Sequence, residues 1–189
     1  MKELIPRYHK YINLFFLIVI LSISAESLAQ DKQPTSNRDA VIAAAKEIMG
    51  MQNYCALITI DSEGLPDVRT MNPYPVEDNM IIWMATNRQS GKAKEILSNP
   101  NVCVYFADHK NASGYVALNG KAEVIDDKEL LVKKKREYWE QVSPDWKNIF
   151  VLIKIVPQKM EVVNYKYGLY GEPVTWKAPS IEFENKASD

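Results

Sequence analysis

The spacing of apolar residues along the chain predicts three helices. Apolar positions recur three or four residues apart through 37–50 and again through 91–98. Ser90 is the expected N-cap of the second helix, and Asn99-Pro100 is its expected stop. A longer amphipathic pattern covers 126–142, where we expect one continuous helix.

Runs rich in β-branched and aromatic residues predict strands between these helices. They cover 54–60, 65–72, 79–86, 102–108, 114–125 and 150–165. The second and third runs flank the sequence PYPVED and are expected to pair as a hairpin. Gly120 suggests a bulge or bend, and Pro157 an interruption or bend in the last strand. About six strands joined by turns or single helices indicate a mainly β, antiparallel, barrel-like fold with peripheral helices.

The first 29 residues follow a different pattern. Three basic residues precede the apolar run 12–24, and Ser27 and Ala29 occupy the −3 and −1 positions of a cleavage site before Gln30. This is typical of a secretory signal peptide, since a membrane span needs roughly 20 apolar residues. We therefore expect export to the periplasm or another extracytoplasmic compartment, with no stable membrane span after cleavage. An uncleaved anchor is the alternative.

Composition places one globular domain behind this segment. The chain has 189 residues, 47% hydrophobic and 25% charged. We expect a flexible lead at 30–37, the β domain at 38–164 and an irregular tail at 165–189. Residues 1–29 carry a net charge of +1, which leaves −2 of the total of −1 for the remainder. A mildly acidic domain does not favour nucleic-acid binding, and the basic run 133–137 is interpreted as a solvated helix face.

Few side chains qualify for metal or acid–base chemistry. Cys55 and Cys103 lie in strand-like runs without metal-ligand spacing, and the chain has only two histidines, His9 and His109. No metal site is expected. The cysteines either form a disulfide or, as we favour, stay buried and reduced. His109 is interpreted as an exposed loop residue, so no catalytic residue is identified.

Lys92 is the residue that most needs an explanation. It stands in the first turn of the helix after Ser90, where the helix dipole disfavours a cation by a few tenths of a kcal/mol. It is either a solvated surface lysine or the partner of an anion, most plausibly a phosphate, at the helix start. If the predicted hairpin turns at 77–78, Arg69 lies opposite Thr86, close to Ser90 and Lys92. Such convergence would form a phosphate site.

Arg69, the spacing T-x-x-x-S-x-K at 86–92, and the segments NPNVCVYF and LNGKAEVI together resemble the pyridoxamine 5'-phosphate oxidase-like superfamily. Within it the chain is similar to the general-stress-protein branch, over about residues 38–164. The resemblance implies a split β-barrel homodimer with FMN at the subunit interface. By position it implies that Arg69 and Lys92 hold the FMN phosphate, assisted by Ser90. The backbone around Thr70, Met71, Asn72, Ala85 and Thr86 would run beside the ribityl chain and ring.

The chain also departs from this pattern. True oxidases commonly carry an arginine directly before the motif lysine, where this chain has Gly91. They hold pyridoxal phosphate with a C-terminal arginine–histidine signature, whereas here no arginine follows Arg136 and no histidine follows His109. A tryptophan often ends the last strand in the general-stress branch. Here EVVNY stands in that place, and whether Trp176 substitutes is open. Oxidation of pyridoxamine phosphate is therefore not expected.

Three functions remain open from the sequence. The first is an FMN-dependent redox protein that moves electrons between flavin and a small molecule or oxygen, with the protein binding and tuning the cofactor. The second is a non-catalytic, stress-related module that holds a flavin or haem. The third is a scaffold without a ligand. The sequence leaves open which of these applies and whether the protein is an enzyme.

Overall fold

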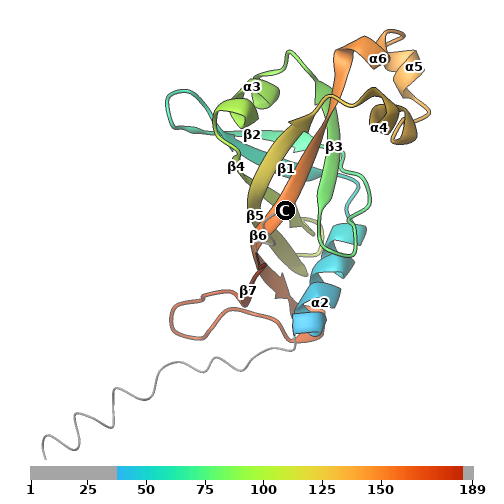
Figure 1. Cartoon of the computed structure of the whole chain (residues 1–189). Coiled ribbons are helices and arrows are strands. Elements are labelled where there is room, and N and C mark those ends of the chain that lie inside the picture. Colours follow the sequence, from blue (N-terminus) through green and yellow to red (C-terminus); the bar gives the residue numbers. More distant parts are fainter. Residues whose placement is uncertain (1–37, 185–189) are drawn as a thin grey trace, which may run out of the picture. The chain divides into compact units, whose positions relative to one another are not determined.

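The computed structural model describes residues 38–184 as one antiparallel sheet with a few helices (Figure 1). The strand order is β2-β1-β4-β5-β6-β3, and β7 pairs with β6 beside this path. The strands are β1 (Cys55–Ile60), β2 (Pro66–Met71), β3 (Ile82–Asn87), β4 (Asn101–Ala107), β5 (Gly114–Ile125), β6 (Phe150–Asn164) and β7 (Ser180–Glu182). The mainly β, antiparallel barrel-like prediction is confirmed. The predicted signal peptide 1–29 and lead 30–37 lie outside the described residues.

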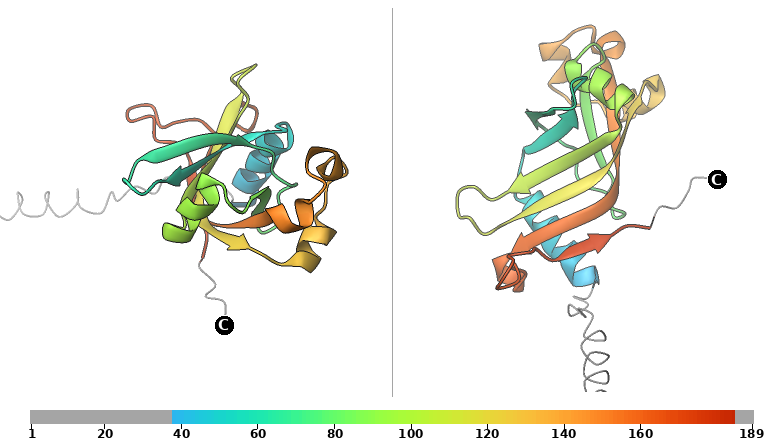
Figure 2. Two further views of the ribbon diagram at one scale, coloured as in Figure 1. Left: turned by 90° about the horizontal axis from the view of Figure 1, so that it is seen from above. Right: turned by 90° about the vertical axis from the view of Figure 1, so that its left-hand side faces the viewer.

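The helices cover different parts of the sheet. They are α2 (Arg38–Gly50), α3 (Gly91–Ser98), α4 (Lys128–Lys133), α5 (Trp139–Val142) and α6 (Trp146–Ile149), with the short 3-10 helix η1 (Tyr165–Tyr167). Helices α3 to α6 lie at one end of the sheet, and the loop that follows η1 lies at the other (Figures 1 and 2). The two ends of the sheet line the two cavities that are described below.

The predicted hairpin between β2 and β3 is wrong. β2 pairs with β1, which puts Arg69 opposite Leu57, and β3 pairs with β6, which puts Thr86 opposite Val151. A tight turn at 61–64, closed by a 2.9 Å bond from Asp61 N to Leu65 O, joins β1 to β2. The β2–β3 connection instead contains two prolines, which lack the amide hydrogen that a ladder needs.

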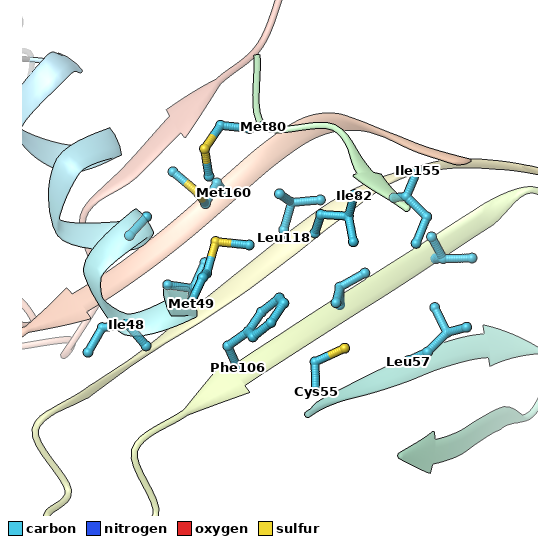
Figure 3. Close-up of a cluster of buried hydrophobic side chains, with 14 of the residues drawn as sticks. Ile48, Met49, Cys55, Leu57, Met80, Ile82, Phe106, Leu118, Ile155 and Met160 are labelled. Carbon is cyan, nitrogen blue, oxygen red and sulfur yellow. The ribbon is translucent and has the colours of Figure 1, made fainter. Parts of the chain in front are cut away.

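Side-chain alternation along the strands builds two apolar clusters. On β3, Ile82 and Met84 point into the main core, whereas Trp83 points to the opposite face. The main core fills the space between the sheet and α2, where Ile48 and Met49 pack toward the strands (Figure 3). The second cluster lies beneath α4–α6 and consists of Trp83, Leu131, Trp139, Trp146 and Leu152.

The single helix predicted for 126–142 is broken into two. α4 ends at Lys133, and a non-helical stretch of five residues precedes α5. In this stretch the Lys134 ammonium lies 4.5 Å from the ring centre of Trp83, and Lys135 pairs with Glu140 at 2.5 Å. Trp139 is buried with its ring edge against Phe150. Cation–π and aromatic packing thus override the local helical pattern.

The long β5–β6 pair contains the irregularity predicted at Gly120. The register shifts between Asn119 and Gly120, and Gly120 faces Pro157 on β6. A Cβ at position 120 would lie 2.3 Å from the carbonyl oxygen of Val156, so only glycine allows this approach. β6 bends without ending, which lets one strand reach both ends of the sheet.

The two cysteines are free thiols on opposite faces of the sheet. Cys103 lies opposite Ile58, three residues after Cys55 on β1, so the alternation of side chains points the two thiols apart. Cys55 is buried, and burial raises the pKa of its thiol to about 12. Because the two thiols point apart, the favoured prediction of unpaired, reduced cysteines is confirmed. Cys103 is only half-buried, so the prediction of burial holds for Cys55 alone.

The segment after residue 164 is less irregular than predicted. It contains η1 and the strand β7, whose Ile181 lies opposite Met160 and packs into the main core. Over residues 38–184 no helix is long and apolar enough to cross a membrane.

Candidate functional site

The start of α3 has the geometry that the sequence predicts. Ser90 is the N-cap, with extended backbone angles of φ −65° and ψ 152°, and its hydroxyl accepts a 3.4 Å hydrogen bond from Ala93 N. The first-turn amides of Gly91 and Lys92 have no intrahelical acceptor. The first turn of α3, which contains Lys92, therefore offers amides without an intrahelical acceptor.

Lys92 is a partly buried cation that lacks an anion. Its Nζ donates to Thr86 Oγ1 at 3.2 Å, and that oxygen lies 3.2 Å from Ser90 Oγ. Burial, and then the positive charge of Arg69, lower the pKa of the Lys92 ammonium. Among residues 38–184, Lys92 forms no ion pair. The carboxylates of Glu95 and Asp67 act on Lys92 from beyond ion-pair distance and offset this effect only in part, so a bound anion would stabilise the ammonium.

Arg69 is near this site but already paired. Its guanidinium donates to Asp67 and to the hydroxyl of Thr59, and it reaches Glu95 Oε2 at 3.1 Å. The side chain is only 19% exposed, and it does not line the cavity described below. A guanidinium has five N–H donors, so Arg69 has enough of them to donate to a phosphate as well. The role of Arg69 as a phosphate ligand stays a prediction.

A cavity of about 240 Å³ lies beside Lys92. Six of the eight predicted cofactor residues line it: Thr70, Met71, Asn72, Ala85, Thr86 and Lys92. The ends of β2 and β3 bring them together even though these strands do not pair. The other two do not line the cavity: the Ser90 hydroxyl contacts the hydroxyl of Thr86, and Arg69 lies outside the lining.

Four further residues line this cavity, three from the segment between β5 and β6 and one from the start of β6, and the sequence did not assign them to the site. They are Arg136, Tyr138, Trp139 and Phe150. Arg136 Nη2 donates to the carbonyl oxygens of Asn72 at 3.1 Å and Pro73 at 2.7 Å, and its guanidinium stacks 4.3 Å from the ring centre of Tyr74. The basic run, interpreted as a solvated face, thus supplies a second cation to the cavity.

Gly91 leaves a gap at the position where the oxidases commonly carry an arginine. A Cβ here would come within 3.0 Å of Glu95 Oε1, the end of a flexible side chain, and the backbone does not require glycine. The polar side chains of Thr86, Lys92 and Arg136 line the cavity, and the first-turn amides of α3 lie next to Lys92 along the chain.

These residues fit a phosphate attached to an aromatic group. Lys92 and the helix amides suit the anion, and Trp139 and Phe150 offer flat apolar walls. The cavity is smaller than the 300–1,000 Å³ usual for whole ligands, so one chain encloses only part of a molecule the size of FMN. No group of three or more His, Cys, Asp or Glu side chains suited to a metal occurs in the described range.

Comparison with known proteins agrees with this geometry. The family model described as pyridoxamine 5'-phosphate oxidase matches residues 41–164, which span β1 to β6 and the whole candidate site. The chain belongs to the pyridoxamine 5'-phosphate oxidase family.

Within this family the chain is similar to general stress proteins. It is 27% identical to general stress protein 26 of Bacillus subtilis, over 68% of this chain and 91% of that protein. The solved structure of general stress protein 26 from Bacillus anthracis is 25% identical and matches with a TM-score of 0.54, covering 64% of this chain and 92% of that one. The predicted split-barrel fold and general-stress branch are confirmed.

The match to the oxidases themselves is partial. A pyridoxine/pyridoxamine 5'-phosphate oxidase of Agrobacterium fabrum is 36% identical over 87 residues, which cover 46% of this chain and 41% of that enzyme. The chain thus spans about two fifths of the length of the curated oxidases it matches, and their activity does not carry over by similarity alone.

Proposed function

We propose that the protein binds FMN at the Lys92 cavity and passes electrons between the flavin and a small molecule or oxygen. The observation that carries this proposal is Lys92 itself, a partly buried ammonium with a hydroxyl contact and no carboxylate partner at the start of a helix. A dianionic phosphate provides the missing counter-charge, and membership of the family makes a flavin phosphate the first candidate.

Each part of the cavity has a role in this proposal. Lys92 and the first-turn amides hold the phosphate, and Thr86 orients the ammonium. The backbone of 70–72 and Ala85 borders the ribityl chain and ring, while Trp139 and Phe150 exclude water. When bound, the flavin supplies the redox chemistry, and the protein supplies binding and shielding.

We further propose that the functional unit is a homodimer. β2 is an edge strand. Its Val68 is 58% exposed, and Leu65, which directly precedes the strand, is 57% exposed. The cavity of one chain is too small to enclose FMN, so a second copy would complete it. Oxidation of pyridoxamine phosphate is not part of the proposal, because these 189 residues contain no arginine after Arg136 and no histidine after His109.

The absorption spectrum of the protein purified without added cofactor tests the proposal. Flavin bands that bleach reversibly on reduction are the expected result. A Soret band would instead favour the second candidate, a haem-binding module. A colourless protein that also fails to bind added FMN would overturn the flavin assignment and favour a scaffold without ligand.

A further inference from the structure

A second cavity, of about 610 Å³, lies at the opposite end of the sheet from Lys92. It is lined by the ends of β4 and β5, by the turn between them and by the loop that follows β6. The register shows the separation: Gly114 and Asn164 pair at this end, whereas Phe150 pairs with Asn87 near the Lys92 cavity. No part of the proposed FMN site lines it.

Aromatic side chains make up much of its wall. They are Tyr105, His109, Tyr115, Tyr165, Tyr170 and Trp176. Tyr105 and Tyr115 come from adjacent strands, with ring centres 5.6 Å apart and planes tilted by 33°. Tyr165, Tyr170 and Trp176 come from the loop after β6 and are exposed to solvent. Rings from three segments therefore surround one space.

The charged groups of the wall are all acidic. The lining contains Asp108 and Glu172 and neither lysine nor arginine. Asp108 accepts hydrogen bonds from Ser113 Oγ at 2.7 Å and Asn111 Nδ2 at 3.0 Å, and these bonds lower the pKa of its carboxyl to about 2. Glu172 accepts from the hydroxyl of Thr175 and from the amides of Val174 and Thr175, and these bonds lower the pKa of its carboxyl. Both groups therefore carry fixed negative charge at neutral pH.

The backbone holds Trp176 at the rim at some cost. Trp176 has a φ of +59°, a conformation that bulky residues rarely adopt, and its side chain is 82% exposed. Trp176 N donates to Glu172 O at 2.8 Å, and Glu172 N donates to Lys177 O at 3.0 Å. At Gly171 a Cβ would lie 2.6 Å from the Trp176 carbonyl oxygen. Strain that keeps a large ring in solvent points to a use for that ring.

We propose that this aromatic cavity binds an organic cation of the quaternary ammonium type. Ring faces attract a cation that cannot donate hydrogen bonds, and such cages of aromatic side chains are the usual way to recognise it. Asp108 and Glu172 add attraction through space, and the lack of basic side chains in the wall disfavours anions. The two cavities have no lining residue in common, so this inference does not depend on FMN binding.

Calorimetric titration of the full chain with choline tests the proposal. The matched probe is its uncharged carbon isostere, in which a tert-butyl group replaces the trimethylammonium group. Choline should bind saturably and about two- to five-fold more tightly than the isostere, as expected for cation–π contacts with solvent-exposed rings. Absence of saturable choline binding, or equal binding of both probes, would overturn the proposal.

Two loop variants locate the binding. Trp176→Asn removes the ring and suits the positive φ, and it should weaken choline binding by about three-fold or more. Val174→Asn is the control, because Val174 is 87% exposed in the same loop and does not line the cavity. Equal choline affinity in both variants would show that Trp176 takes no part in binding and would contradict the assignment of choline to this cavity.

Discussion

At the scale of single residues, Lys92 decides between a ligand site and a plain surface. A surface lysine would extend into water, whereas this one turns toward Thr86 and the cavity wall, where burial lowers the pKa of its ammonium. Arg69 shows the opposite case, since Asp67 and Glu95 neutralise it within the chain. Arg69 thus has carboxylate partners within the chain, whereas Lys92 has none at ion-pair distance among the described residues.

Lys92→Ala should weaken FMN binding by about 1.5–3 kcal/mol, which is roughly ten- to a hundred-fold in dissociation constant. Without ligand the variant should be as stable as the wild type or slightly more stable, because the change removes a cation from the wrong end of a helix. Fluorescence titration with FMN and thermal melts of both apoproteins measure the two effects.

Lys94→Ala is the matched control for that substitution, since Lys94 lies on the same helix and is exposed. It should leave FMN affinity unchanged. If Lys92→Ala and Lys94→Ala bind FMN equally well, Lys92 is a surface lysine and the principal reason for a flavin site is lost.

The carboxyl group of Asp108 should make the stability of the fold depend on pH in the acid range. Hydrogen bonds from Ser113 and Asn111 lower the pKa of its carboxyl from 3.8 to about 2 in the folded chain. Because the folded pKa lies below the unfolded one, the contribution is fully present above about pH 4 and is lost as the pH falls through 2. Thermal melts between these values should show Asp108→Asn losing less stability than the wild type does. Parallel pH dependence in the two proteins would contradict this.

At the scale of elements, the β5–β6 pair depends on the bulge at Gly120. Gly120→Ala places a Cβ against the Val156 carbonyl, and we expect a loss of about 1–3 kcal/mol in the free energy of unfolding. Urea denaturation measures it. Gly50→Ala is the control, because nothing lies within 4 Å of a Cβ there, and it should be neutral or stabilising. Equal effects at both positions would show that the bulge tolerates a side chain.

The segment between β5 and β6 shows how an element acquires a second role. Its break at Lys133 frees Lys134 and Arg136 to stack on Trp83 and Tyr74. The same break aims Arg136 at the carbonyl oxygens of 72–73, at the edge of the Lys92 cavity. In a continuous helix Lys134 and Arg136 would point to nearly opposite sides, since positions two apart are separated by about 200°.

At the scale of the whole molecule, assembly is the first proposal to test. A homodimer with an obligate interface would bury on the order of 2,000 Å² or more in total. Light scattering should therefore report twice the chain mass at micromolar concentration, with or without FMN. A monomer under these conditions would contradict the proposed shared cavity.

Export is the second proposal at this scale. If residues 1–29 are a signal peptide, the exported protein begins at Gln30. N-terminal sequencing of material from the extracytoplasmic fraction measures this directly. Recovery of a chain that still begins at Met1 would instead support the uncleaved anchor.

Local patterns by themselves determined a large part of this protein. The N-cap at Ser90, the helix after it and the place of Lys92 in its first turn follow from residues within one helical turn of each other. The antiparallel class, the bulge at Gly120 and six residues of the cavity wall were also predictable. These features depend on short-range sterics, hydrogen bonding and side-chain periodicity, or on a family pattern of residue order.

Tertiary structure alone decided the remainder. Local sequence did not settle that β2 pairs with β1 rather than β3, because the partner of a strand is selected by the packing of the whole sheet. It could not place Arg136 in the cavity, since residues 64 positions apart meet there. The pair between Arg69 and Glu95 and the approach of Tyr105 and Tyr115 to the loop of Trp176 are likewise contacts between distant segments. Such contacts are selected by the packing of the whole sheet, and no spacing along the chain records them.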